Sequence, residues 1–212
     1  QDLTGVRNAL KKTAKVMGAG TPVASVTEHV IEGPCDNIIF RVFKPSGADQ
    51  LRPAFIWFHG GAFLMGGLDT GESICRRIAS VSGAVVVAVQ YRLAPEHDLY
   101  ACREDGYAAV EWIARNGASI GIDSTRLAVG GDSAGGNISA AIAHECIRRG
   151  GPTLQLQVLV YPNTDVAGSY ASRQAFADGP WLTAPLMQWF ERHALGELDR
   201  ADPRVSPLRA DA

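Results

Sequence analysis

The sequence predicts an α/β fold in which a mostly parallel central sheet carries helices on both faces. Short continuous apolar runs, typical of strands buried on both sides, recur between residues 54 and 161. Segments with apolar residues at helical spacing separate these runs, and this alternation indicates βαβ units. Two strand-like segments around Gly33-Pro34 come first and predict an antiparallel hairpin at one edge of the sheet.

Each expected element follows from a local pattern of apolar and turn-forming residues. Strands are expected at 26–31, 37–43, 54–58, 84–89, 127–130 and 154–161. Helices are expected at 6–17, 73–81, 104–115, 134–149 and 184–194, with a glycine-rich loop at 59–67 and an irregular segment at 166–181. Glu104 and Asp105 are interpreted as a negative pair at a helix N-terminus. We expect no strand after Tyr161.

The composition argues against several classes of function. The 212 residues are 46% hydrophobic and have a formal net charge of −2, so they lack the basic surplus that attracts nucleic acid or an anionic membrane. No apolar run reaches the length of a transmembrane helix, and the charged N-terminal segment differs from a signal peptide. The four widely spaced cysteines are expected to be reduced thiols. We therefore predict a cytoplasmic protein that binds neither nucleic acid nor membranes.

The strongest signal for chemistry is the segment Gly131-Asp132-Ser133-Ala134-Gly135, which matches G-x-S-x-G. A predicted strand precedes it and a predicted helix follows it, which is the context this motif requires. Such a turn exposes the serine hydroxyl at the carboxyl edge of the sheet. An ordinary strand–helix turn that happens to contain serine is the alternative. The flanking elements favour Ser133 as a nucleophile.

A second signal is the loop His59-Gly60-Gly61-Ala62-Phe63, which directly follows the predicted strand at 54–58. In hydrolases with a nucleophilic serine at such a turn, this loop supplies amides to the oxyanion hole. We predict that the amides of Gly60, Gly61 and Ala134 form that hole. Each donor contributes roughly 3 kcal/mol in the transition state. Asp132 and His59 are expected to support these groups without contacting substrate.

These two motifs make the chain resemble bacterial esterases of the hormone-sensitive-lipase-like family of α/β-hydrolases. The resemblance covers nearly all of residues 25–210 and extends to 91–97 (YRLAPEH), 131–137 (GDSAGGN), 161–162 with Asp165, 178–179, 182–183, 202–204 and 206–208. It implies the α/β-hydrolase fold and a helical lid. It also implies hydrolysis of short-chain acyl or aryl esters through an acyl-enzyme, with a small-molecule ester as partner and a homodimer left open.

The resemblance divides the chain into four parts. Residues 1–24 are expected to form the N-terminal part of the lid, and residues 25–165 the incomplete hydrolase core. Residues 166–200 would add the second part of the lid, and residues 201–212 would return to the core. Members of the family continue into two further strands, whose loops carry the triad acid and histidine. We therefore expect the C-terminal strands, the triad acid and the histidine to lie outside this chain.

Two departures from the family pattern bear on the chemistry. Ala62 stands where a third glycine is frequent, a familiar variant that should preserve the oxyanion hole. A triad from within the chain would have to be Ser133, Asp165 and His193, because the chain order of the fold is serine, acid, histidine and His193 alone among the histidines follows Asp165. His193 falls on the expected lid helix, so we do not favour this triad.

Two further readings remain at this point. A non-catalytic small-molecule-binding protein on the same fold could lack the triad histidine, although it would have no need of both motifs. The chain could also be part of a longer active enzyme, which we favour. No cluster of His, Cys and Asp has the spacing of metal ligands, and no glycine loop matches a nucleotide-binding pattern. Neither a metal nor a cofactor is expected.

Overall fold

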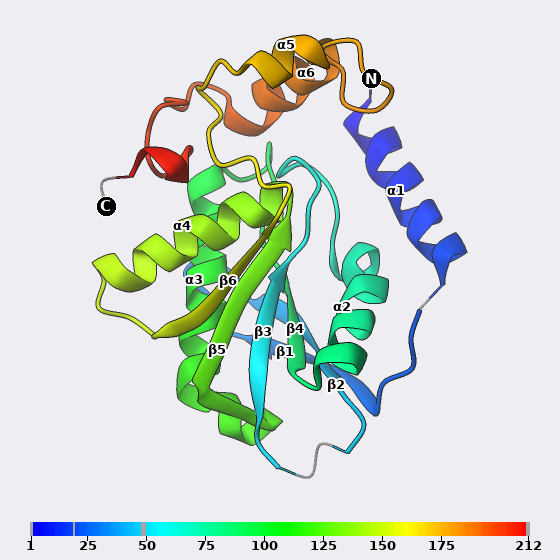
Figure 1. Cartoon of the computed structure of the whole chain (residues 1–212), viewed down its shortest axis with the longest axis vertical. Coiled ribbons are helices and arrows are strands. Elements are labelled where there is room, and N and C mark those ends of the chain that lie inside the picture. The colour runs from blue at the N-terminus through cyan, green and yellow to red at the C-terminus, as the bar shows by residue number, and fades with distance from the viewer. Residues whose placement is uncertain (1, 19, 48–49, 211–212) are drawn as a thin grey trace.

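The computed structural model describes residues 2–18, 20–47 and 50–210, and it has the predicted alternation of strands and helices (Figure 1). The strands are β1 (Ser25–Ile31), β2 (Ile38–Lys44), β3 (Arg52–Phe58), β4 (Val85–Gln90), β5 (Ile122–Asp132) and β6 (Leu154–Val160). The helices are α1 (Leu3–Met17), α2 (Leu68–Ser82), α3 (Leu99–Asn116), α4 (Ala134–Arg148), α5 (Ala171–Ala175) and α6 (Ala184–Leu195). Short 3-10 helices span Gly117–Ile120 and Pro207–Arg209.

The strands form one sheet in the order β1-β2-β4-β3-β5-β6. The hairpin β1–β2 is antiparallel and β2 also runs antiparallel to β4, whereas β4, β3, β5 and β6 are mutually parallel. The prediction of a mostly parallel sheet with an antiparallel edge is therefore confirmed. Because parallel strands share one direction, the segments that follow β3, β4, β5 and β6 all emerge at the same edge of the sheet.

Helices cover both faces of the sheet, as the apolar strands require. Helix α2 lies on one face and helices α3 and α4 on the other (Figure 1). The strands β3 and β4 are buried along most of their length, and Ile56, Val87 and Val129 in β3, β4 and β5 are fully enclosed. At about 25 cal/mol per Å² of apolar surface, this burial is the main source of stability.

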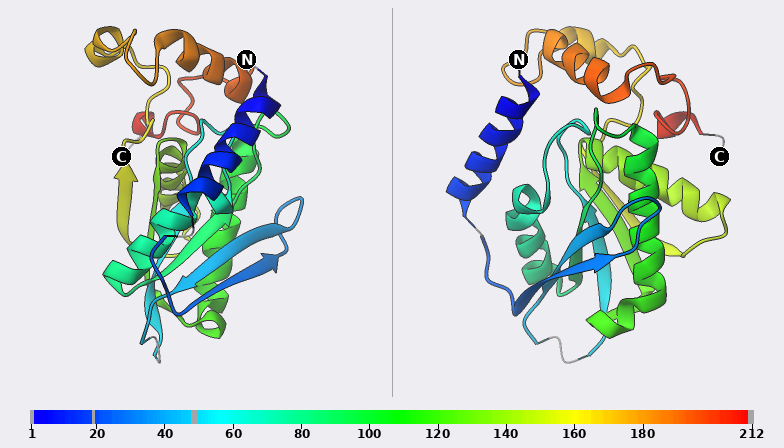
Figure 2. Two further views of the ribbon diagram at one scale, coloured as in Figure 1. Left: turned by 90° about the vertical axis from the view of Figure 1, so that its right-hand side faces the viewer. Right: turned by 180° about the vertical axis from the view of Figure 1, so that it is seen from behind.

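Helices α5 and α6 lie beyond the carboxyl edge of the sheet, and α1 runs from beside α6 to beside α2 (Figure 2). Val6 and Leu10 of α1, together with Trp189 and Phe190 of α6, pack against the main core cluster. The assignment of 1–24 and 166–200 to a lid stays a prediction. Residues 1, 19, 211 and 212 of the four-part division lie outside the described residues.

The structure corrects the expected start of two helices. Helix α2 begins at Leu68 after Gly67, and α3 begins at Leu99, where the Asp98 carboxylate accepts a hydrogen bond from the Ala101 amide at 2.8 Å. The interpretation of Glu104 and Asp105 as an N-terminal charge pair is therefore wrong, because both lie beyond the first turn of α3. The segment 166–181, expected to be irregular, contains the short helix α5.

The buried carboxylate of α3 has a structural partner. Asp105 forms an ion pair with Arg92 at 2.7 Å and also accepts the Arg92 amide at 3.0 Å. Glu104 is paired with Arg149 of the segment after α4. The pair predicted to act together on a helix end therefore binds two different arginines from two different loops.

Strand β6 is the last strand of the sheet in the described part of the chain. It pairs with β5 on one side, and its side chains Leu156 and Val158 are 57% and 37% exposed. An apolar strand with one free edge is a surface to which another strand can add.

Candidate active site

Ser133 lies in a tight turn between the end of β5 and the start of α4, as the motif predicts. Its backbone has φ 53° and ψ −114°, a conformation that a residue with a Cβ rarely adopts. Hydrogen bonds hold the turn in place: the Ser133 amide donates to Val160 at 2.9 Å, and the Ser133 carbonyl accepts from Asn137 at 3.1 Å. A strained backbone of this kind persists only where its surroundings fix it.

The glycines of the motif let strand and helix approach closely. A Cβ added to Gly131 or to Gly135 would overlap the carbonyl oxygen of Phe58, which belongs to the neighbouring strand β3. The Ala134 amide is at the first position of α4, where an N–H group has no acceptor within the helix. The turn therefore places the Ser133 side chain beside an unoccupied amide at the positive end of a helix dipole.

The glycine loop after β3 folds into a turn with three consecutive residues at positive φ. The values are 129° at Gly61, 54° at Ala62 and 64° at Phe63. The Gly61 carbonyl accepts hydrogen bonds from the amides of Leu64 and Met65, each at 3.0 Å. We call Gly61–Met65 the oxyanion turn. Its Cβ-bearing residues Ala62 and Phe63 hold a conformation that costs about 1–3 kcal/mol each.

The Gly60 amide is engaged in a different way from the one we expected. It donates a hydrogen bond to the Asp132 carboxylate at 2.9 Å, so this N–H is committed to a side chain and not to a ligand. The assignment of Gly60 to the oxyanion hole stays a prediction, and its amide is hydrogen-bonded to Asp132 in this structure. Ala62 of the same loop is a further candidate donor. The sequence signal for Ala62 was its place where the family frequently has a third glycine.

Asp132 links the two motifs. Its carboxylate binds the glycine loop while its neighbour Ser133 forms the turn after β5. Burial raises the pKa of Asp132, and the hydrogen bond from the Gly60 amide opposes that rise. The supporting position that the sequence suggested for Asp132 agrees with this bond.

His59 is buried at the base of the glycine loop, and its ring stacks on Tyr91 with centroids 4.3 Å apart. The Nδ1–H group donates to the Gly60 carbonyl at 2.8 Å, and the Tyr91 hydroxyl donates to the His59 carbonyl at 2.6 Å. Burial lowers the pKa of His59 to about 4, although the Gly60 hydrogen bond raises it. The imidazole is therefore neutral at pH 7 and braces the loop.

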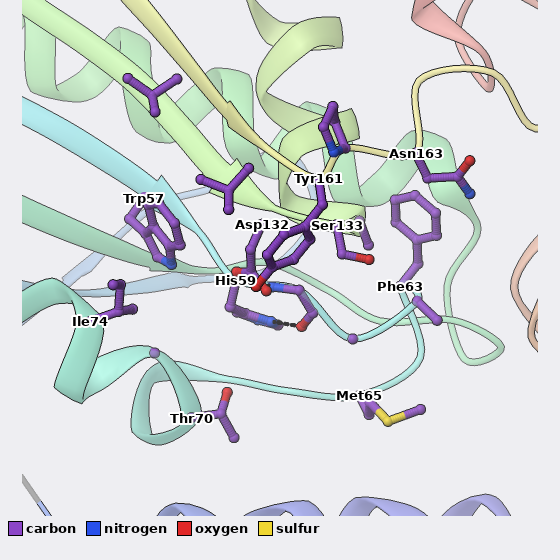
Figure 3. A pocket seen from close by; sticks show the side chains of 18 of the residues that line it. Trp57, His59, Phe63, Met65, Thr70, Ile74, Asp132, Ser133, Tyr161 and Asn163 are labelled. Carbon is purple, nitrogen blue, oxygen red and sulfur yellow. Dashed lines mark hydrogen bonds between the residues drawn. The ribbon is translucent and has the colours of Figure 1, made fainter. Parts of the chain in front are cut away.

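Ser133 lines a large cavity of about 1780 Å³. Figure 3 shows Ser133 and Asp132 at the end of β5, with Phe63 and Tyr161 near the serine hydroxyl. The cavity wall is mainly apolar, and it includes Gly61, Ala62, Phe63, Ala134, Val166, Leu186 and Phe190, together with Leu10 from α1. It continues along the α2 side of the sheet past Trp57, Ile74 and Val158. The arrangement can hold an apolar group against Ser133.

Asp165 and His193 are occupied by other partners. The Asp165 carboxylate accepts from Arg209 at 2.7 Å and from the Tyr170 hydroxyl at 2.7 Å, and the Arg209 bond is the main reason why the pKa of Asp165 lies well below its usual range. The His193 Nδ1–H group donates to the Trp189 carbonyl at 2.8 Å. Within the described residues, no hydrogen bond joins either group to Ser133.

Among the residues that the structure places, no group of three or more His, Cys, Asp and Glu side chains could hold a metal ion. No described helix has the length and apolar character needed to cross a membrane. Cys75, Cys102 and Cys146 are buried free thiols, and Cys35 is an exposed one.

Comparison with known proteins places these features in context. The pattern of a family with the alpha/beta hydrolase fold matches residues 55–212. Esterase LipI of Mycobacterium tuberculosis is 42% identical over 194 residues, which is 90% of this chain and 61% of the relative. Carboxylesterase NlhH of the same species is 40% identical over 171 residues, which is 81% of this chain and 54% of the relative.

Solved structures are equally similar. An esterase from Pyrobaculum calidifontis has a TM-score of 0.93 and 40% identity, with 100% of this chain and 70% of that chain covered. An ester hydrolase from the metagenome of Lake Arreo has a TM-score of 0.94 and 41% identity, with 99% of this chain and 68% of that chain covered. The present chain thus spans little more than half the length of the curated relatives that it matches.

Proposed function

Because the chain belongs to the alpha/beta hydrolase fold family, we propose that it carries the nucleophile and the oxyanion hole of a serine carboxylesterase. The observation that supports this most is the pairing of two strained turns at one cavity. Ser133 has φ 53°, and the oxyanion turn of a separate strand lines the same space. Residues with a strained backbone are found most often at functional sites, where the strained conformation points their groups toward a ligand.

The proposed reaction is acyl transfer. The Ser133 Oγ attacks the ester carbonyl carbon, its proton passes to a base, and the alcohol leaves to give an acyl-enzyme. Amides of Gly61, Ala62 and Ala134 would bind the oxyanion of the tetrahedral intermediate, and each is worth roughly 3 kcal/mol. Water then hydrolyses the acyl-enzyme and releases the acid.

A base is needed, because a serine hydroxyl alone is a weak nucleophile at neutral pH. His59 donates its Nδ1–H to Gly60, and His193 donates its own to Trp189, so neither is oriented toward Ser133 by a hydrogen bond. We propose that polypeptide outside residues 1–212 supplies the base and its acidic partner, and that it pairs with the free edge of β6. That edge leads directly to Tyr161, which lines the cavity.

The proposed substrates are small esters with apolar acyl or aryl groups. Phe63, Val166, Leu186 and Phe190 give apolar side chains to the lining of the cavity that contains Ser133. We further propose a cytoplasmic protein, a location in which the free thiols would stay reduced. Sedimentation of the native protein would test for a homodimer.

Hydrolysis of p-nitrophenyl acetate and butyrate by the native protein tests the proposed function. Ser133→Ala should lower kcat by at least about 10³-fold, since it removes the nucleophile. Ser119→Ala is the matched control, because the Ser119 hydroxyl is exposed and only caps the Asn116 carbonyl at 2.7 Å. Equal turnover by wild type and Ser133→Ala would refute the assignment. A native protein that binds esters without turning them over would favour the non-catalytic reading.

A further inference from the structure

Arg7 of helix α1 binds three separate acceptors with one guanidinium group. Its Nε donates to the Leu64 carbonyl at 2.6 Å, and its Nη2 donates to the Ala94 carbonyl at 2.8 Å. The Glu96 carboxylate accepts two further hydrogen bonds, at 2.6 and 2.8 Å. A residue near the N-terminus is thereby tied to two loops that follow β3 and β4.

The first of these loops contains the oxyanion turn, and the second is hydrogen-bonded to it. The Leu64 carbonyl that accepts from Arg7 shares its peptide group with the Met65 amide, and this amide donates to the Gly61 carbonyl at 3.0 Å. The Ala94 amide donates to the Phe63 carbonyl at 2.9 Å, which joins the second loop to the same turn. Arg7 therefore closes a network whose other members all lie in or next to the strained turn.

The bonds to backbone carbonyls matter more here than the ion pair. Glu96 is 55% exposed, and an exposed ion pair contributes little net stability. The Leu64 side chain is fully buried, so its peptide cannot readily move to find water as a substitute partner. Arginine suits this position because its rigid fork of five donors can serve several acceptors at once, which the single ammonium group of lysine cannot do.

Helix α1 also forms part of the cavity itself. Leu10 lies one turn after Arg7 and lines the cavity that contains Ser133, while Val6 packs against the core cluster. Helix α1 therefore contacts the site in two ways. Leu10 forms part of the cavity wall, and Arg7 binds the loop that contains the oxyanion turn.

We propose that Arg7 is a positioning residue, and that its bonds to Leu64 and Ala94, here called the Arg7 latch, hold the oxyanion turn in its active conformation. This inference rests on the proposed esterase function. When α1 is in place, the latch fixes the peptide after Leu64, and the turn keeps its positive φ values. When the latch is broken, the turn relaxes and its amides no longer converge on the substrate oxygen.

The test compares Arg7→Met with Arg7→Lys, Glu96→Gln and Lys11→Met in the native protein. Lys11→Met removes a charge from the exposed side of the same helix and is the matched control. Arg7→Met should lower kcat about 10- to 100-fold, with KM changed less than kcat, because misplaced oxyanion donors act on the transition state. Arg7→Lys should recover only part of kcat, and Glu96→Gln should stay within about 2-fold of wild type.

Hydrogen–deuterium exchange gives a readout that needs no turnover. The amides of Leu64 and Met65, which both donate to Gly61, should exchange faster in Arg7→Met than in Lys11→Met. The comparison can be repeated in the Ser133→Ala background, so a failure of the latch is distinguishable from a failure of the proposed nucleophile. Unchanged exchange at these amides overturns the proposal. So does a variant that loses stability while its folded fraction keeps the wild-type kcat. If Arg7→Met does not fold, Arg7→Lys carries the same test.

Discussion

Replacement of His59 by asparagine should flatten the acid side of the protein's stability profile. The His59 ring is fully enclosed, and its Nδ1–H donates to the Gly60 carbonyl. The Nδ2 amide of asparagine sits close to the place of Nδ1 and can keep that hydrogen bond. It does not titrate, so His59→Asn removes the proton equilibrium while it preserves the bond that braces the glycine loop.

The magnitude follows from the two pKa values. The pKa of His59 is about 4 in the folded protein and 6.5 in the unfolded chain, and burial is the main cause of the difference. Above pH 6.5 both states are neutral and the group has no effect. Below pH 6.5 His59 binds a proton in the unfolded chain but stays neutral in the folded protein, so the folded state loses stability. The loss is about 2 kcal/mol at pH 5 and saturates near 3 kcal/mol below pH 4.

Urea unfolding of the native protein between pH 5 and 8 measures this effect. The free energy of unfolding of wild type should fall by about 2 kcal/mol more than that of His59→Asn between pH 7 and pH 5. The variant also loses the stacking of His59 on Tyr91. That loss lowers its free energy of unfolding equally at every pH, so it does not affect the change between pH 7 and pH 5. His144→Asn, which removes an exposed imidazole on α4, should keep the wild-type profile. Parallel profiles for wild type and His59→Asn would refute the reasoning.

Two pairs of substitutions test the packing and the hydrogen bonding of the two turns beside the cavity. Gly135→Ala should destabilise the fold by about 3 kcal/mol or more, because the added Cβ would overlap the Phe58 backbone. Gly71 lies inside α2, and a Cβ added there would be 3.7 Å from its nearest neighbour, Trp57. Gly71→Ala should therefore stabilise the fold by up to about 1 kcal/mol. Asp132→Ala should cost about 1–3 kcal/mol by leaving the Gly60 amide without an acceptor, and Asp132→Asn should cost clearly less. Chemical denaturation measures the free energy of unfolding of all four variants. Equal losses of stability for Gly135→Ala and Gly71→Ala would contradict the packing argument. Equal losses for Asp132→Ala and Asp132→Asn would contradict the hydrogen-bond argument.

The sequence predicted the sheet and the serine turn well because both depend on local patterns. The apolar runs of β3, β4 and β5 needed only their length and context to be recognised as buried strands. The helix starts were less well predicted. Helix α3 begins at Leu99 because the Asp98 carboxylate caps it. The predicted start followed the apolar pattern, which begins later, and did not take this single capping residue into account.

For the candidate site, the sequence predicts which loops carry the groups, but it does not predict where each amide points. A glycine motif tells which loop approaches the substrate, whereas the direction of each N–H depends on the φ and ψ angles of the turn. The structure aims the Gly60 amide at Asp132, a residue 72 positions later in the chain. The contacts of Arg7 with Leu64 and Ala94 span 57 and 87 positions. No local pattern contains such information.

Covalent labelling of the native protein with a fluorophosphonate tests the central claim most directly. These reagents phosphonylate a serine only when a base has activated its hydroxyl and nearby donors stabilise the developing charge. Peptide mapping by mass spectrometry should find one adduct on the peptide that contains Ser133, and Ser133→Ala should take up none. An unmodified Ser133 under conditions that label another residue, or a native protein that takes up no label at all, would contradict the account.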